Sequence, residues 1–160
     1  MDQPTEITGR VPDPQSIAMF RERPGVWLTF AGSAFLSLYA ERLGPLKMKP
    51  GWVTAMAIIA ERSGITQSAL ARALRINRAS SMALAATLEN LGYVSREAAS
   101  GRNQVELALS TLGQAKLADA CAVEDDLTAT IFGWLSDTEL SGVVSALKRI
   151  ATDANSFPNQ

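Results

Sequence analysis

Arginine is the only basic residue type between positions 61 and 110, where the chain carries six arginines and four acidic residues. Three of these arginines, Arg72, Arg75 and Arg78, recur at intervals of three residues. Arginine can bind phosphate or guanine through two parallel hydrogen bonds, which lysine cannot do. Residues 111–160, by contrast, carry three basic and seven acidic groups. A mildly basic middle beside an acidic end suggests that the middle binds an anion; the alternative is an ordinary solvated surface.

Catalytic chemistry has few candidate residues, because the chain contains no histidine and one cysteine, Cys121. Ser-His-Asp and Cys-His catalysis, an intrachain disulfide and a Cys/His zinc site are therefore excluded. We expect a protein that is not an enzyme, with no cofactor and no metal. Adjacent carboxylates on a helix diverge, so Glu124–Asp126 is interpreted as a solvated face rather than a cation site. Cys121 is expected to be buried on the inner stripe of a long helix, since no basic side chain flanks it to favour a redox-sensing thiolate.

The chain has 160 residues, enough for one domain with additional arms. Its 47% hydrophobic content excludes a fully disordered protein. The stretch Pro24–Ala40 lacks charge, but its glycine, serine and threonine residues favour a buried or dimer-packed helix over a membrane span. The first residues show no export pattern, so we expect a cytoplasmic protein.

Two short helices separated by a tight turn must position the arginines. The first is expected over Thr66–Leu74, with Thr66 as its N-cap, and the second over Arg78–Leu91, with Asn77 as its cap. Gly92 is a suitable residue to end the second helix. The apolar stripe expected on that helix comprises Leu84, Ala85, Leu88 and Leu91.

A β-hairpin is expected directly after the helix pair. Val105, Leu107 and Leu109 alternate with other residues at the period of a half-buried strand, and Val94–Ala98 is its partner. Ser100–Gly101 supplies the turn. Helix, turn, helix and hairpin together form a winged helix-turn-helix, in which a helix fits the major groove of DNA.

The remaining elements frame this unit. A polar, proline-bearing arm covers residues 1–15, and a helical region from Ser16 to Leu43 is expected to break at Pro24. A short apolar helix covers Trp52–Arg62. Two capping boxes, Thr111–Gln114 and Ser136–Glu139, are expected to open helices that end near Leu135 and Thr152. Along the first of these, Leu117, Cys121, Leu127, Ile131 and Trp134 should share one side.

Candidate DNA contacts come from both helices and the hairpin, with double-stranded DNA as the expected partner. Apolar contact with thymine methyl groups is expected from Met82 or Ala83. The hairpin Arg96–Gln104 would reach the backbone or minor groove. The full set of candidate DNA-binding residues is Ser68, Arg75, Asn77, Arg78, Ser80, Met82, Thr87, Arg96, Arg102 and Asn103.

A small-molecule site has weaker candidates. Trp27, Phe30 and Trp52, with Phe35, could line a pocket between the first helices and the hairpin domain. Aromatic residues at helical spacing also commonly serve as core, and this alternative stays open.

Several ordered segments resemble the MarR-type transcriptional regulators. They are Pro50–Trp52 (PGW), Thr66–Ser80 (TQSALARALRINRAS), Leu88–Arg96 (LENLGYVSR) and Leu109–Gly113 (LSTLG), within a resemblance that runs from Phe20 to Ile150. The resemblance implies a mainly α winged helix-turn-helix with a small β-hairpin wing, whose terminal helices form a homodimer on a pseudo-palindromic operator. It also implies a small aromatic effector that alters the spacing of the two DNA-binding heads.

Combined with this resemblance, the expected division is an N-terminal arm at 1–15, dimerisation helices at 16–48, the DNA-binding domain at 49–110, C-terminal dimerisation helices at 111–154 and a tail at 155–160. We expect the protein to be a sequence-specific transcriptional regulator that acts as a repressor, and we expect an aromatic ligand to relieve the repression.

Two departures from the family pattern support other functions. Residues 79–95 contain no basic residue, and Ser81 stands where the family usually has a core-facing aliphatic residue. The wing stretch Ser100–Asn103 (SGRN) lacks the usual aspartate of Asp-x-Arg. Fewer phosphate contacts lower the salt-dependent affinity for DNA. One alternative is therefore a winged-helix dimer that binds a ligand or a protein without strong DNA binding. Another is a dimerisation module like that of small-molecule methyltransferases, which the lack of a glycine-rich cofactor loop disfavours.

Overall fold

The computed structural model describes residues 18, 21–62, 64–98 and 105–156. The expected arm at 1–15, the hairpin turn at Ser100–Gly101 and the last residues of the tail lie outside these ranges. The elements are α1 (Pro24–Leu43), the 3-10 turn η3 (Gly44–Leu46), α2 (Pro50–Glu61), β1 (Ile65–Thr66), α3 (Gln67–Leu74), α4 (Arg78–Asn90), β2 (Val94–Ala98), β3 (Val105–Leu109), α5 (Thr111–Phe132) and α6 (Asp137–Ser156).

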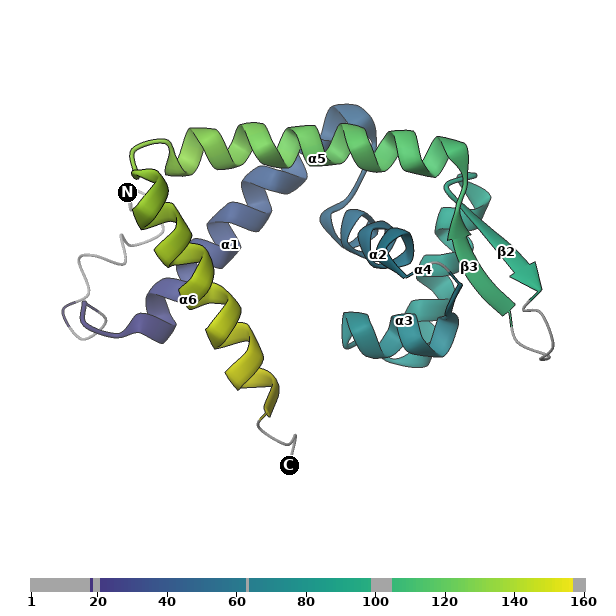
Figure 1. Ribbon diagram of the computed structural model, residues 1–160, viewed down its shortest axis with the longest axis horizontal. Coiled ribbons are helices and arrows are strands. Elements are labelled where there is room, and N and C mark those ends of the chain that lie inside the picture. Colours follow the sequence, from purple (N-terminus) through teal and green to yellow (C-terminus); the bar gives the residue numbers. More distant parts are fainter. Residues whose placement is uncertain (1–17, 19–20, 63, 99–104, 157–160) are drawn as a thin grey trace, which may run out of the picture.

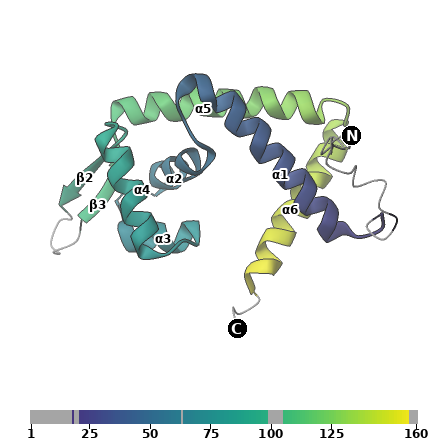
Figure 2. The ribbon, with the colours of Figure 1, turned by 180° about the vertical axis from the view of Figure 1, so that it is seen from behind.

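The long helix α5 connects two parts of the molecule (Figure 1). At its beginning lies the head, made of α2, α3, α4 and the small sheet, and at its far end α1 and α6 cross one another in both views (Figures 1 and 2). The architecture is mainly helical with one small antiparallel sheet, as expected for a winged helix.

The helix pair has the predicted caps. The Thr66 hydroxyl accepts a hydrogen bond from the Ala69 N–H at 3.3 Å, and the Asn77 side chain accepts one from the Ser80 N–H at 2.8 Å. Each bond satisfies an N–H group that the first helical turn leaves without a partner. Gly92, at φ +74°, ends α4 in the left-handed conformation that glycine adopts without penalty.

The hairpin also matches its prediction, and it gains a third strand. β2 pairs with β3 from Val94 opposite Leu109 to Ala98 opposite Val105. β1, which was not predicted, pairs with the other edge of β3, with Ile65 opposite Leu107. Two residues carry too little periodicity to be recognised as a strand. This third strand ties the start of α3 to the base of the wing.

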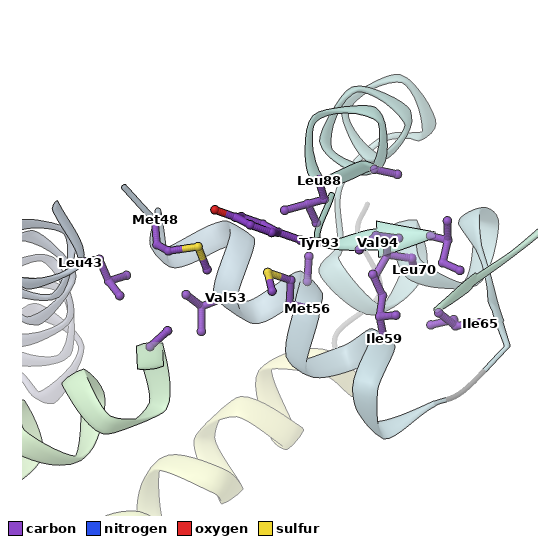
Figure 3. Close-up of a cluster of buried hydrophobic side chains, with 14 of the residues drawn as sticks. Leu43, Met48, Val53, Met56, Ile59, Ile65, Leu70, Leu88, Tyr93 and Val94 are labelled. Carbon is purple, nitrogen blue, oxygen red and sulfur yellow. The ribbon is translucent and has the colours of Figure 1, made fainter. Parts of the chain in front are cut away.

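The core is continuous from the end of α1 through α2 to the head (Figure 3). Its fully buried large side chains are Leu43, Met56, Ile59, Leu70, Leu88, Leu107 and Leu127, together with Ser81. Because α2 lies between the other elements, it packs on α3, on β3 and on α5. The packing of α3 on α2 therefore fixes the position of the helix pair relative to the rest of the core.

Several predicted boundaries shift. α1 begins at Pro24, where the missing N–H costs nothing, and residues 16, 17, 19 and 20 of the helical region expected before it lie outside the described ranges. Likewise α2 begins at Pro50 rather than Trp52. α5 is capped by Ser110, whose hydroxyl accepts from the Gly113 N–H at 2.9 Å, and Thr111 is already helical. α5 then ends at Phe132. The box Ser136–Glu139 is confirmed, with the Ser136 N–H donating to the Glu139 carboxylate at 2.8 Å.

Four side chains expected on buried faces are exposed in the single chain: Leu91, Val105, Cys121 and Trp134. Of the stripe predicted on α5, Leu127 is buried and Leu117 and Ile131 pack against the core, whereas the buried residue near Cys121 is Ala120, one position earlier. Trp134 lies beyond the end of α5 and is 79% exposed. Leu91 follows the last turn of α4, and Val105 lies at the end of the wing that is far from the core.

Helix α6 has no fully buried residue over 137–154, the part of it whose burial is described. Its apolar side chains nevertheless share one face, with Leu140 and Val143 half-buried and Val144, Leu147 and Ile150 exposed. An amphipathic helix that leaves its apolar face open usually finds a partner for it.

Candidate nucleic-acid interface

The beginning of α3 forms one side of a polar hollow of about 500 Å³. The hollow is lined by Thr66, Gln67, Ser68 and Arg72, by Arg78 of α4 and by Val105 of β3. It therefore joins two guanidinium groups to a helix N-terminus, where backbone N–H groups and the helix dipole favour an anion. A phosphate group has the charge and the acceptor oxygens that such a site binds.

The structure brings together two residues that the sequence analysis assigned to DNA, Ser68 and Arg78, and adds Arg72 and Gln67 to them. The Gln67 backbone carbonyl accepts a hydrogen bond from the buried Ser81 hydroxyl at 3.3 Å. In the described part of the chain, the side-chain nitrogen of Gln67, Nε2, is buried without a hydrogen-bond partner. Arg72 is one of the three regularly spaced arginines singled out in the sequence, but the position of Gln67 depends on the contact between α3 and α4.

Arg75 occupies the left-handed conformation that ends α3, at φ +56°. Its N–H donates to the Arg72 carbonyl, and the next N–H, of Ile76, donates to the Ala71 carbonyl. This pattern satisfies helix carbonyls but is normally built on glycine. The exposed Arg75 side chain thus projects from the turn between the two helices. The Asn77 side chain, in contrast, is used as the cap of α4.

The outward face of α4 is apolar and small. Ala79, Met82 and Ala83 are exposed there, on the side opposite the buried Ser81 and Ala85. Ser80 is also exposed. The hydroxyl of Thr87 donates to the Ala83 carbonyl of the same helix at 2.8 Å, so its donor is already used.

The wing residues divide into two groups. Arg96 of β2 forms an ion pair with Glu89 of α4, with Nε 2.8 Å from Oε2. This ion pair holds the Arg96 side chain against the end of α4. Arg102 and Asn103 lie outside the described residues.

The predicted ligand residues lie on two different helices, α1 and α2. Trp27 is half-buried on α1, and its ring N–H donates to the Arg21 carbonyl at 3.0 Å. Phe30 is exposed on the same helix, whereas Trp52 lies on α2 with the Lys49 ammonium 5.2 Å from its ring centre. Their role in ligand binding stays a prediction.

An apolar hollow of about 490 Å³ lies elsewhere, between α1, α5 and α6. Phe35 and Leu36 line it from α1, Phe132 from α5, and Leu140 and Leu147 from α6. The sequence predicts the apolar stripe of Leu140, Val144 and Leu147 on this helix. It does not predict that the stripe lies against α1. Beside the hollow, burial and the nearby Glu124 and Cys121 raise the pKa of Tyr39.

Other kinds of site find no support in the residues that the structure describes. Within these ranges no three side chains of the metal-binding types gather into a cluster. None of the helices there combines the length and the apolar character that a membrane crossing requires.

A family model described as MarR family matches residues 46–102, the stretch that contains α2, the helix pair and the first strand of the wing. The match relates this stretch to the MarR family, whereas β3 and the helices α1, α5 and α6 lie outside it.

Solved structures extend the likeness to the whole fold. The apo form of MarR from E. coli superposes with a TM-score of 0.69 at 21% identity, covering 79% of this chain and 96% of its own. CouR from Rhodococcus jostii RHA1, bound to p-coumaroyl-CoA, gives 0.73 at 22% identity, over 87% and 95%. The Mycobacterium tuberculosis MarR family protein Rv2887 with p-aminosalicylic acid gives 0.66 at 20%, over 80% and 98%. No curated protein sequence matches this chain.

Proposed function

We propose that this chain is a sequence-specific, DNA-binding transcriptional regulator that acts as a repressor and not as an enzyme. The observation that carries the proposal is the hollow at the start of α3, where Ser68, Arg72 and Arg78 converge beside the exposed face of α4. In the proposed complex α4 lies in the major groove, the hollow holds a backbone phosphate, and Arg75 and Arg96 contact the flanking backbone. A protein that acts on genomic DNA in this way would work in the cytoplasm.

The test is binding to duplex DNA, measured by fluorescence anisotropy. The full chain would be titrated with its own upstream intergenic DNA and with a scrambled duplex, each at two salt concentrations. We expect a preference of roughly a thousandfold or more for the native duplex and a steep salt dependence. Arg78→Ala should weaken binding about tenfold and reduce the salt slope by about 1. Arg149→Ala on α6, which removes the same charge far from the head, is the control. Equal weak binding to both duplexes would contradict the proposal.

We further propose that a second copy covers the apolar faces of α1 and α6. Leu36 is 55% exposed, Leu147 43% and Ile150 46%, which is unusual for one contiguous region of a monomer. Light scattering should give twice the mass of 17.1 kDa. Leu147→Asp should shift the protein towards the monomer, whereas Ser145→Asp, on the opposite face of α6, should not. A wild-type monomer at micromolar concentration would contradict this arrangement.

We also infer that a small aromatic effector lowers the affinity for DNA, since two of the superposed structures hold p-coumaroyl-CoA and p-aminosalicylic acid. The ligand would favour a spacing of the heads that does not fit the operator. Trp27, Phe30 and Trp52 are its proposed contacts. Salicylate should quench tryptophan fluorescence, with less quenching in Trp27→Phe and Trp52→Phe. Unchanged quenching in both variants would place the site elsewhere.

The second candidate function is a winged-helix dimer that binds a protein or a ligand without strong DNA binding. The observation that favours it is the uncharged outward face of α4, from Ala79 to Ala86. The anisotropy experiment separates the two functions, because this candidate requires weak, salt-insensitive binding to every duplex.

A further inference from the structure

The outward face of α4 has an unusual chemistry for a helix that enters DNA. Ala79, Met82 and Ala83 are exposed on it, and Ala86 continues it as a half-buried residue. Met82 is 48% exposed, so its thioether side chain stands clear of the head. Between Arg78 and Glu89 the helix carries no charged residue. This face therefore has no side chain that could bind guanine through two hydrogen bonds.

The same face is surrounded by groups that would bring it to DNA. Arg78 begins α4, Arg75 projects from the turn before it, and the hollow with Arg72 lies beside them. A protein partner with an apolar surface would not require this set of guanidinium groups, whereas a polyanion with an apolar feature would match both. The major groove of DNA has one apolar feature, the 5-methyl group of thymine.

From this complementarity we propose that α4 selects its operator mainly through the 5-methyl groups of thymine, which Met82, Ala79 and Ala83 contact. This inference rests on the proposed function. The alanines have short side chains and let the helix backbone approach the floor of the groove, while the flexible methionine fills the remaining space. Specificity then comes from apolar contact and shape, and the arginines supply affinity without reading bases.

The test replaces thymine by deoxyuridine, which differs only by the missing methyl group. A duplex selected by the full chain from a randomised library would be made with thymine, with deoxyuridine inside the half-sites, and with deoxyuridine only in the flanks. We expect about a fourfold loss of affinity for each methyl contacted, and no loss from the flanking substitutions. Arg78→Ala should weaken binding to the thymine and deoxyuridine duplexes by the same factor.

Variants of the protein assign the effect to α4. Met82→Ala should bring the ratio of thymine to deoxyuridine affinity closer to one, because it removes the contacting side chain. Leu112→Ala is the matched control, since Leu112 is 51% exposed and belongs to the first turn of α5 rather than to α4. Both side chains are outside the core, so both variants should fold, which circular dichroism would verify.

The outcomes separate this inference from the function on which it rests. A selected duplex that binds equally well with thymine and with deoxyuridine would overturn the thymine readout and leave sequence-specific DNA binding intact. Failure to select any duplex over a scrambled one would overturn both, and would direct attention to a protein partner for this face of α4.

Discussion

The Nε atom of Arg96 lies 2.8 Å from a carboxylate oxygen of Glu89, an ion pair that joins the wing strand β2 to the last turn of α4. Both side chains are more than a third exposed, so the pair adds little to stability. Its importance lies in the charge balance of the surface that we propose to face DNA. On that surface Glu89 neutralises one of the few arginines available for phosphate and adds a negative charge.

Glu89→Gln should therefore raise the affinity for DNA. The substitution releases Arg96 and removes a charge that repels phosphate, so we expect a gain of about threefold at low salt, with a steeper salt slope. Anisotropy titrations at two salt concentrations would measure it. Glu41→Gln on α1, with the same change in net charge, should have a smaller effect. Weaker binding by Glu89→Gln would show that the pair instead positions the wing.

The backbone conformation of Arg75 is expected to lower the stability of the fold, while its side chain supplies a charge for DNA binding. Its φ of +56° is disfavoured for any residue with a Cβ atom. Arg75→Gly and Arg75→Ala both remove the charge and should weaken DNA binding alike. Only glycine relieves the backbone, so it should be more stable than the alanine variant by about 1 kcal/mol in urea unfolding. Equal stability of the two variants would argue against strain at this turn.

Gly113 is expected to be irreplaceable. A Cβ atom there would overlap the carbonyl oxygen of Tyr93, a backbone atom that cannot move aside easily. Gly113→Ala should lower the melting temperature by several degrees or prevent folding. Gly142→Ala is the matched control, because it also lies within a helix but meets nothing within 4 Å. That variant should gain roughly 0.5–1 kcal/mol. A fully stable Gly113→Ala variant would contradict the close approach of α5 to Tyr93.

Ser81 and Leu88 are both fully buried on the inner side of α4, yet we expect different costs when each is truncated. Leu88→Ala removes apolar volume from the core and should cost about 3 kcal/mol. Ser81→Ala loses one long hydrogen bond, at 3.3 Å, and should cost about 1 kcal/mol or less. Denaturant unfolding of both variants would measure the difference. A large cost at Ser81 would show that its hydroxyl is essential for the contact between α3 and α4.

The start of α6 should show a pH dependence. Hydrogen bonds from the Ser136 hydroxyl and N–H lower the pKa of Glu139. A carboxyl whose pKa is depressed by folding stabilises the folded state above its unfolded pKa, and this stabilisation is lost as the pH falls through the folded pKa. Ser136→Ala should therefore lower the melting temperature at about pH 7, with a difference that shrinks below about pH 4. Thr138→Ala, in the same turn, should show no such change with pH. A constant difference for Ser136→Ala would exclude this linkage.

Much of the head could be predicted because its signals are local. The caps at Thr66 and Asn77, the stop at Gly92 and the two hairpin strands each depend on residues within a few positions of one another. The capping box at Ser136 was predictable for the same reason. At Ser110 and Thr111 local reasoning could not choose, because both residues can cap a helix. The choice of Ser110 accompanies its contact with the Gly92 carbonyl, which lies eighteen positions away.

The sequence by itself determined the order of the elements and the residue types on each face, since helix and strand periods and caps are properties of short segments. Only the tertiary structure decided which groups meet. The pairing of β1 with β3, the ion pair of Arg96 with Glu89 and the convergence of Arg72 with Arg78 all join separate elements. The burial of Ala120 instead of Cys121 depends on the rotation of α5, which packing against distant residues sets. Such contacts have no signature along the chain, because they result from how whole faces fit together.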